Sequence, residues 1–263
     1  MARAKRHYIP GQVWHITHRC HKKEFLLRFA KDRRRMLQWL YEAKRRYKLT
    51  ILDYTVTSNH IHLLVVDDGD QETIARSMQL VAGRFAQEYN ERKGRSGAYW
   101  EDRYHATAVQ TGDHLMRCLV YIDLNMVRAG VVDHPSQWRF GGYNEIQFPR
   151  RKYVLIAYEK LTALAGFQTY DSFRKSHKKS VNQFLAQGNN VRDNQWTRSI
   201  AVGEEQFVEK IKAALGTRAV GRQIRHVPGG YELREEMNFY NADFGPKKSD
   251  ISLENTSKWI SFS

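Results

Sequence analysis

The amino-acid sequence predicts an α+β fold in which helices flank a central antiparallel sheet. Two observations support this prediction. Short apolar segments with the two-residue period of β-strands alternate with longer segments whose apolar residues recur at helical spacing. Two of the strand-like segments are separated only by Ser58 and Asn59, and so short a connection joins antiparallel neighbours as a hairpin.

Each expected element has its own sequence pattern and its own boundary residues. The helices show one apolar stripe each; Asp70 offers an N-cap, and Gly130 is suited to follow a helix C-terminus. In chain order the expected elements are strand 13–20, helix 31–48, strands 49–57 and 60–66, helix 71–92, strand 104–110 and helix 111–129.

The regular pattern weakens after about Phe148, which divides the chain into two predicted domains. Residues 1–150 form the predicted catalytic domain, and residues 151–263 form a basic extension that we expect to be mainly helical. The extension contains expected helices at 154–164, 180–187 and 203–215, and its last thirty or so residues are polar and expected to be loosely ordered.

The composition excludes several classes of protein. No run of 18 apolar residues is present, and the first residues do not resemble a signal peptide. Cys20 and Cys118 are the only cysteines and lie far apart, so neither a disulfide framework nor a structural zinc site is expected. The reducing cytoplasm is therefore the expected compartment.

The net charge of +15 is unevenly distributed. Residues 1–50 carry a net charge of +12 and residues 151–200 carry +6, whereas residues 51–150 carry −3. Basic segments on both sides of a nearly neutral centre favour a polyanionic partner. The simpler alternative is that these residues form ordinary solvated helix faces. Binding to an anionic membrane is disfavoured, because every apolar helix face near the basic segments is needed for the core.

His60-Ile61-His62 lies in a predicted strand, and its two histidines share one face because side chains alternate along a strand. They stand about 6–7 Å apart along the strand, close enough to share one divalent metal ion. Such a pair also occurs in strands without any metal, so the metal reading depends on a third ligand.

The 111–129 helix supplies that candidate ligand. His114, Arg117, Tyr121, Asn125 and Arg128 follow one another at helical spacing on one face. If this helix packs beside the strand, His60, His62 and the amide oxygen of Asn125 form a mixed nitrogen and oxygen set suited to Mg²⁺ or Mn²⁺. Tyr121 would then reach a metal-bound phosphate; the alternative is a solvated helix face with a half-buried tyrosine.

Residues 58–65, 99–104 and 121–132 carry three motifs in a characteristic order. Together these motifs resemble the HUH single-strand DNA endonucleases, and more narrowly the REP-associated tyrosine transposases of the insertion-sequence-200-like group. The resemblance covers roughly residues 7–147, and residues 196–203 and 216–222 also resemble the C-terminal extension of some members. Family members usually carry proline after the asparagine, whereas Met126 stands here, so we expect the helix to continue through Asn125 without a kink.

The resemblance implies a ferredoxin-like or RRM-like HUH core and a transposase that cuts single-stranded DNA. Tyr121 would form a 5′-phosphotyrosine link and release a 3′-OH, which can later rejoin DNA, with His60, His62 and Asn125 as the implied metal ligands. No nucleotide cofactor is expected, because the chain has no P-loop and no G-x-G-x-x-G motif after a strand. The implied partner is single-stranded DNA with REP-type hairpins, bound in the bacterial cytoplasm at the nucleoid by a monomer or homodimer.

DNA binding should combine phosphate contacts with base stacking. Each candidate residue also has a structural alternative; Trp100, for example, is equally suited to the core. The candidates are Arg3, Lys5, Arg6, Arg33, Arg34, Arg84, Trp100, Arg103, Tyr104, Arg117 and Arg128.

Three other functions remain open from the sequence. The first is a non-catalytic DNA-binding or regulatory protein that keeps the fold. The second is a metal-dependent hydrolase that uses water on RNA or on a small phosphate ester. The third is a zinc protein built on His18, Cys20 and His21, which no second ligand pair at zinc-site spacing follows.

Overall fold

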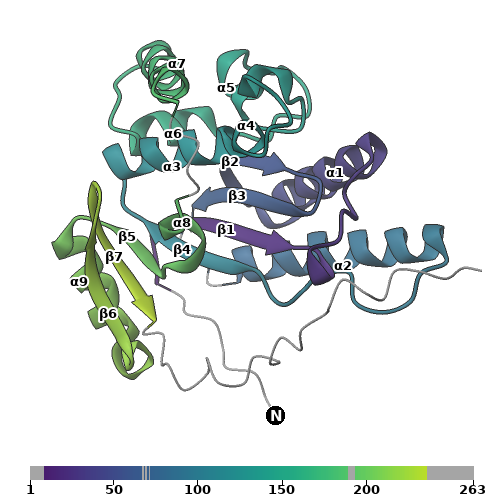
Figure 1. Cartoon of the computed structure of the whole chain (residues 1–263), viewed down its shortest axis with the longest axis horizontal. Coiled ribbons are helices and arrows are strands. Elements are labelled where there is room, and N and C mark those ends of the chain that lie inside the picture. The colour runs from purple at the N-terminus through teal and green to yellow at the C-terminus, as the bar shows by residue number, and fades with distance from the viewer. Residues whose placement is uncertain (1–8, 67, 69, 71, 189–192, 236–263) are drawn as a thin grey trace, which may run out of the picture.

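A computed structural model describes residues 9–66, 68, 70, 72–188 and 193–235 of the chain. The predicted α+β fold is confirmed: strands and helices alternate as β-α-β-β-α-β, and the four strands pair in the order β2-β3-β1-β4 with every neighbour antiparallel (Figure 1). This is the ferredoxin-like arrangement. Its elements are β1 (Val13–Arg19), α1 (Ala30–Tyr47), β2 (Thr50–Val56), β3 (His60–Val66), α2 (Thr73–Lys93) and β4 (His105–Val109).

The remaining elements lie across the sheet and beyond its β4 edge (Figure 1). Strand β5 pairs in parallel with β4, and β7 and β6 continue the same sheet, which thus has seven strands. The elements are α3 (Asp113–Asp123), α4 (Asn125–Arg128), α5 (Tyr143–Gln147), α6 (Tyr158–Leu164), α7 (Tyr170–Ala186), α8 (Gln195–Arg198), β5 (Ala201–Gly203), α9 (Glu205–Leu215), β6 (Arg222–Val227) and β7 (Gly230–Glu235), with short 3₁₀ segments at His21–Lys23, Pro135–Gln137 and Gly216–Ala219.

The three strands of the C-terminal extension were not predicted. Strand β5 has only three residues, too few for a periodic pattern, and β6 consists mostly of polar and charged residues. Only the turn residues Pro228 and Gly229 between β6 and β7 are typical of a hairpin. The division of the chain into domains at residue 150 stays a prediction, although β4 and β5 join both parts in one sheet.

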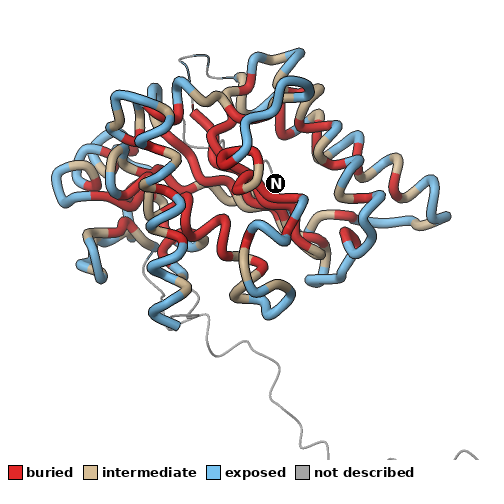
Figure 2. Tube along the Cα trace, turned by 90° about the horizontal axis from the view of Figure 1, so that it is seen from above, coloured by how far each residue is buried: buried red, intermediate tan, exposed pale blue. Residues whose placement is uncertain are grey.

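Helices α1 and α2 pack against each other and cover one face of the sheet (Figure 1). Met36 and Leu40 of α1 and Ile61 and Leu63 of β3 are fully buried in one core. Burying each such side chain contributes about 1.5–3 kcal/mol relative to leaving it in water. Buried residues follow the strands, and exposed residues lie mainly on outer helix surfaces (Figure 2).

The predicted single helix at 111–129 is in fact two helices, so the expectation of an unkinked helix was wrong. Leu124 ends α3 with ψ near 3°, and α4 begins at Asn125. No proline is needed for this break, because the buried side chain of Leu124 packs with Val120, Tyr143 and Val181. The predicted end is confirmed: Gly130 follows α4 with a φ of +66°, which glycine adopts without strain.

The first residues of two other helices differ from the predicted ones, and side-chain hydrogen bonds lie at both of these helix starts. Helix α2 begins at Thr73 with Glu72 as N-cap, while the Asp70 carboxylate accepts hydrogen bonds from the Glu72 N–H at 3.0 Å and the Thr73 hydroxyl at 3.0 Å. Helix α7 begins ten residues earlier than predicted, where the Thr169 hydroxyl accepts from the Ser172 N–H at 3.2 Å.

A buried contact between a histidine and an aspartate joins the extension to the end of α3. His177 Nε2 of α7 lies 2.9 Å from Asp123 Oδ2, and both side chains are fully buried. Burial raises the pKa of the Asp123 carboxyl, and the His177 imidazole opposes that rise. The pair holds α7 against α3 two residues after Tyr121.

Among the residues that the structure describes, none of the helices combines the length and the apolar composition of a membrane span.

Two glycines give a matched test of the packing. A Cβ on Gly142 would overlap the Oδ1 atom of the fully buried Asp53, whereas a Cβ on Gly83, inside α2, meets nothing within 4 Å. We expect Gly142→Ala to lower the free energy of unfolding by about 1–3 kcal/mol through overpacking. Gly83→Ala should raise it by about 0.5–1 kcal/mol. Denaturant unfolding of both variants measures the difference, and changes of equal sign would contradict this account.

Candidate functional site

The structure brings together four side chains that the sequence singled out as a site. The His60 and His62 rings lie 4.8 Å apart, centroid to centroid, and the Tyr121 ring lies 5.9 Å from that of His62. Asn125 Nδ2 is 2.9 Å from His62 Nε2. The four residues come from β3, α3 and α4, and the break at Leu124 separates the two helices that carry Tyr121 and Asn125.

His60 is half-buried and held by residues of its own hairpin. Its Nδ1 lies 2.6 Å from Asn59 Oδ1 and 3.0 Å from the Thr57 hydroxyl. The Asn59 amide nitrogen donates to the Lys23 carbonyl at 3.1 Å, so the amide oxygen faces the ring. His60 Nδ1 therefore carries the proton, and Nε2 keeps the lone pair that a metal ligand requires.

His62 is fully buried, and both of its ring nitrogens are engaged. Nδ1 lies 2.9 Å from His15 Nε2, and Nε2 lies 2.9 Å from the Asn125 amide. His15 is also fully buried; burial lowers its pKa to about 3, and its Nδ1 lies 2.7 Å from the carbonyl oxygen of Trp196. The charged form of a histidine is disfavoured in such surroundings.

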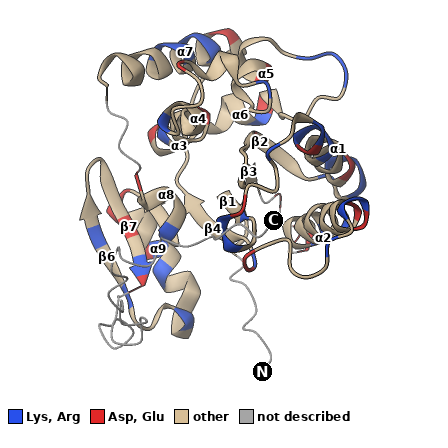
Figure 3. Ribbon diagram, turned by 45° about the vertical axis from the view of Figure 1, so that its right-hand side comes forward, with Lys and Arg blue, Asp and Glu red and all other residues tan. Residues whose placement is uncertain are grey.

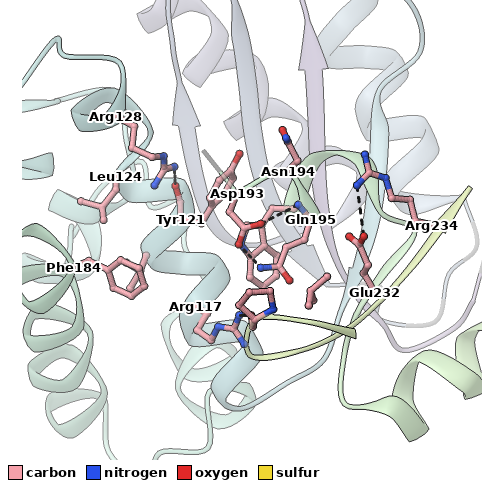
Figure 4. Close-up of a pocket in the computed structure, with 14 residues that line it drawn as sticks. Arg117, Tyr121, Leu124, Arg128, Phe184, Asp193, Asn194, Gln195, Glu232 and Arg234 are labelled. Atoms are coloured by element: carbon pink, nitrogen blue, oxygen red, sulfur yellow. Dashed lines mark hydrogen bonds and ion pairs between the residues drawn. The ribbon is translucent and has the colours of Figure 1, made fainter. Parts of the chain in front are cut away.

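The Tyr121 ring is enclosed on several sides and only 5% exposed. It meets the His15 and His62 rings edge to face, each at 5.9 Å, and lies 6.2 Å from Trp196. The Arg128 guanidinium lies over the ring at 4.3 Å and donates a hydrogen bond to the Tyr121 carbonyl (Figure 4). These contacts orient the phenol, because a cation over an aromatic face is attracted to it.

Two neighbouring cavities lie beside the histidines and Tyr121. The first has a volume of about 540 Å³ and contains His60 and His62 in its wall. The second, of about 510 Å³, contains Tyr121, Arg128 and Trp196 in its wall and lies between α3, α7 and the β6–β7 hairpin (Figure 4). Asn194 lines both cavities, so the segment before α8 separates the space beside the histidines from the space beside the tyrosine.

The cavity beside the histidines has a largely cationic wall. Arg19, Lys23, Arg103 and Arg198 line it, together with the acidic Glu101 and Asp102. Of the four cations, only Arg103 was predicted. The other three come from the end of β1, the segment after it and α8, which no local sequence pattern relates to one another.

Several predicted DNA-binding residues have contacts within the fold. Arg33 donates to the Leu27 carbonyl at 2.9 Å and lies 4.6 Å over the Trp138 ring. Trp100 stacks on His18 at 4.0 Å and donates to the Ala82 carbonyl at 3.0 Å, as its structural alternative implies.

The other predicted DNA-binding residues are spread over the surface. Arg34 and Arg84 are exposed on α1 and α2, Tyr104 is half-buried, and Arg117 donates to the carbonyls of Pro228 and Gly229. Lys and Arg are frequent on α1 and α7 (Figure 3). The predicted basic arm, Arg3, Lys5 and Arg6, lies outside the described residues. A DNA contact for any of these residues stays a prediction.

Two of the three residues of the zinc reading, His18 and Cys20, lie in surroundings that do not favour a zinc ion. His18 Nε2 lies 2.8 Å from the Asp102 carbonyl oxygen, and the ring stacks on Trp100. Cys20 is buried, and burial raises its pKa to about 12, which disfavours the thiolate that a zinc ion needs.

Within the described residues, no group of three or more His, Cys, Asp or Glu side chains is arranged to hold a metal ion. The set at this site contains two histidines and an asparagine, a different combination. It fits a divalent cation: His60 presents an unprotonated Nε2, and the Asn125 amide lies at hydrogen-bond distance from His62 Nε2. Rotation of that amide exchanges its nitrogen for its oxygen.

Two residues of the site were missed by the sequence analysis. His15 stands two residues before Thr17, which pairs directly with His62, so all three share one face of the sheet. The position of His15, two residues from Thr17 in the first strand, could have indicated that it lies near His62, but only after the pairing of the two strands was known. Trp196 contributes its backbone carbonyl, which leaves no trace in a sequence.

Comparisons with protein families and with solved structures each find similar proteins. Residues 11–125 match the family model described as transposase, IS200-like. Among solved structures, the chain is similar to a REP-associated tyrosine transposase bound to a REP hairpin, with 19% identity and a TM-score of 0.46 over 55% of this chain and 84% of that one. It is also similar to a proposed transposase from Deinococcus radiodurans, with 14% identity and a TM-score of 0.33 over 45% of this chain and 92% of that one. No curated protein matches.

Proposed function

We propose that the chain is a transposase that cleaves and rejoins single-stranded DNA through a covalent bond to Tyr121, because residues 11–125 match the family model of IS200-like transposases. Membership of a transposase family implies an enzyme that cuts and transesterifies DNA. The nucleophile, the metal ligands and the DNA target are our proposal.

One observation carries the proposal: Tyr121 lies against a histidine pair and an asparagine amide that come from separate elements. A tyrosine is a weak nucleophile at neutral pH, since its ordinary pKa is about 10. It therefore needs help at the phosphate that it attacks. The histidines and Asn125 would supply that help by holding Mg²⁺ or Mn²⁺.

In the proposed reaction the Tyr121 oxygen attacks a phosphodiester phosphorus, and the bond from phosphorus to the 3′ oxygen breaks. The phenol loses its proton, the departing 3′ oxygen gains one, and the 5′ phosphate stays bonded to the tyrosine. A bound divalent ion would polarise the phosphate and stabilise the departing oxygen. His60 and His62 would hold the ion through Nε2 and Asn125 through its amide oxygen. A 3′-OH attacking the phosphotyrosine reverses the step, so no nucleotide cofactor is required.

The first cavity supports a DNA substrate. Arg19, Lys23, Arg103 and Arg198 line it beside the histidine pair, where they can contact phosphates on either side of the scissile bond. We propose that the target is a hairpin of the REP type, with the protein acting in the cytoplasm at the nucleoid as a monomer or homodimer.

A covalent adduct tests this function. Hairpin-bearing single-stranded DNA, labelled in separate samples at its 5′ or its 3′ end, is incubated with the protein and Mn²⁺ and analysed by denaturing gel electrophoresis. We expect an SDS-resistant adduct that carries the 3′ label, because the 5′ phosphate of the downstream fragment stays on the protein. Binding without an adduct would favour a non-catalytic DNA-binding protein. Multiple-turnover cleavage without an adduct, or cleavage of RNA, would favour the metal-dependent hydrolase.

A further inference from the structure

We propose that His15 is a positioning residue that fixes the proton of His62 on Nδ1, so that Nε2 of His62 is available to a metal ion. The proposal extends the proposed function, because it concerns a ligand of the same site. It rests on a row of hydrogen bonds that runs from Asn125 through both histidines to the backbone of the C-terminal extension.

The direction of these hydrogen bonds is set at the Trp196 end. A backbone carbonyl oxygen only accepts hydrogen bonds, and His15 Nδ1 lies 2.7 Å from the carbonyl oxygen of Trp196. His15 Nδ1 must therefore carry a proton and donate. The carbonyl is itself held in place, because Trp196 is only 2% exposed and belongs to α8, which packs against β4.

The next hydrogen bond follows from the burial of His15. The ring is fully buried between His62, Tyr121 and the backbone of Trp196, where a charged imidazolium would lose its hydration. A neutral imidazole with a proton on Nδ1 has a lone pair on Nε2. His15 Nε2 thus accepts across the 2.9 Å contact, and His62 Nδ1 donates.

His62 is then left with its lone pair on Nε2, the atom beside Asn125. The geometry at this end agrees, because the Asn125 amide nitrogen lies 2.9 Å from that atom and can donate to it. The His15 and His62 rings are nearly parallel, with an interplanar angle of 7°, which suits hydrogen bonding between ring nitrogens. Every donor in the row points from Asn125 toward Trp196.

This arrangement gives the C-terminal extension a part in the metal site. The carbonyl that sets the direction belongs to α8, 181 residues after His15. A partner that orients a metal-binding histidine typically changes metal affinity by about 10–100-fold when it is removed. His15 is such a partner, because it acts through His62 and does not itself need to contact the metal ion.

Two substitutions at this position separate the proton role from packing. A glutamine amide extends about as far as imidazole Nε2, so in His15→Gln its oxygen can accept from His62 while its nitrogen donates to the Trp196 carbonyl. An asparagine amide reaches only as far as Nδ1, so His15→Asn keeps the Trp196 contact and leaves His62 Nδ1 without this acceptor. We expect His15→Asn to weaken Mn²⁺ binding by about 10–100-fold and His15→Gln by less than about tenfold.

The experiment combines calorimetric titration of Mn²⁺ with ¹⁵N NMR of the histidines in the metal-free full-length protein. In the wild type we expect protonated Nδ1 and unprotonated Nε2 on both His15 and His62. A proton on His62 Nε2, or equal Mn²⁺ affinities in the two variants, would overturn the proposal. If His15→Asn fails to fold, the wild-type and His15→Gln spectra decide. Since the spectra need neither DNA nor cleavage, the expected protonation together with no Tyr121 adduct would uphold the role of His15 and refute the nuclease function.

Discussion

Tyr121→Phe is expected to abolish the covalent adduct with DNA while leaving DNA and Mn²⁺ binding unchanged. Phenylalanine keeps the ring that packs against His15, His62 and Arg128 but lacks the oxygen that attacks phosphorus. Losing a nucleophile typically lowers the rate by at least about 10⁴-fold. Denaturing gels measure the adduct, and fluorescence anisotropy with the labelled hairpin measures binding.

Tyr153→Phe is the matched control for this substitution. Tyr153 is 72% exposed and meets Tyr41 edge to face, outside both cavities at the candidate site. This variant should form the adduct at the wild-type rate. An adduct that persists in Tyr121→Phe would show that another residue is the nucleophile, and loss of adduct in both variants would point to a general effect of removing a phenol.

His60→Ala is expected to weaken Mn²⁺ binding by at least about 100-fold, because it removes a proposed ligand rather than a residue that orients one. His60 is half-buried, so the fold should tolerate the change better than loss of the fully buried His62. Adduct formation should fall in parallel. The measurements are Mn²⁺ titration by calorimetry and the adduct assay over a series of Mn²⁺ concentrations.

Removal of the metal gives the complementary result. EDTA should stop adduct formation by the wild type, and Mn²⁺ or Mg²⁺ in excess should restore it in the wild type but not in His60→Ala. His226→Ala is the control, since His226 is an exposed histidine of β6 that contacts the Tyr231 ring. Adduct formation that continues in EDTA would contradict a metal-dependent reaction.

The sequence by itself determined most of the ferredoxin-like core and the composition of the candidate site. Strand β3 begins and ends where the alternation of its residues predicted, and that alternation alone places His60 and His62 on one face. The spacing of Tyr121 and Asn125 likewise indicated that both could reach the same partner. These features depend on residues close together in the chain, whose side-chain directions follow from local geometry.

The tertiary structure decided the features that depend on distant contacts. The break at Leu124 follows from packing against α5 and α7, and Arg33 contacts carbonyls and aromatic rings that its helical pattern could not reveal. Strand β5 exists because β4 and β7 offer it partners on both sides. His15 meets His62 through the pairing of β1 with β3, and its second partner is a backbone carbonyl of the extension. A sequence records side chains but not which strands pair or which carbonyls face them, and those pairings set the hydrogen bonds of His62.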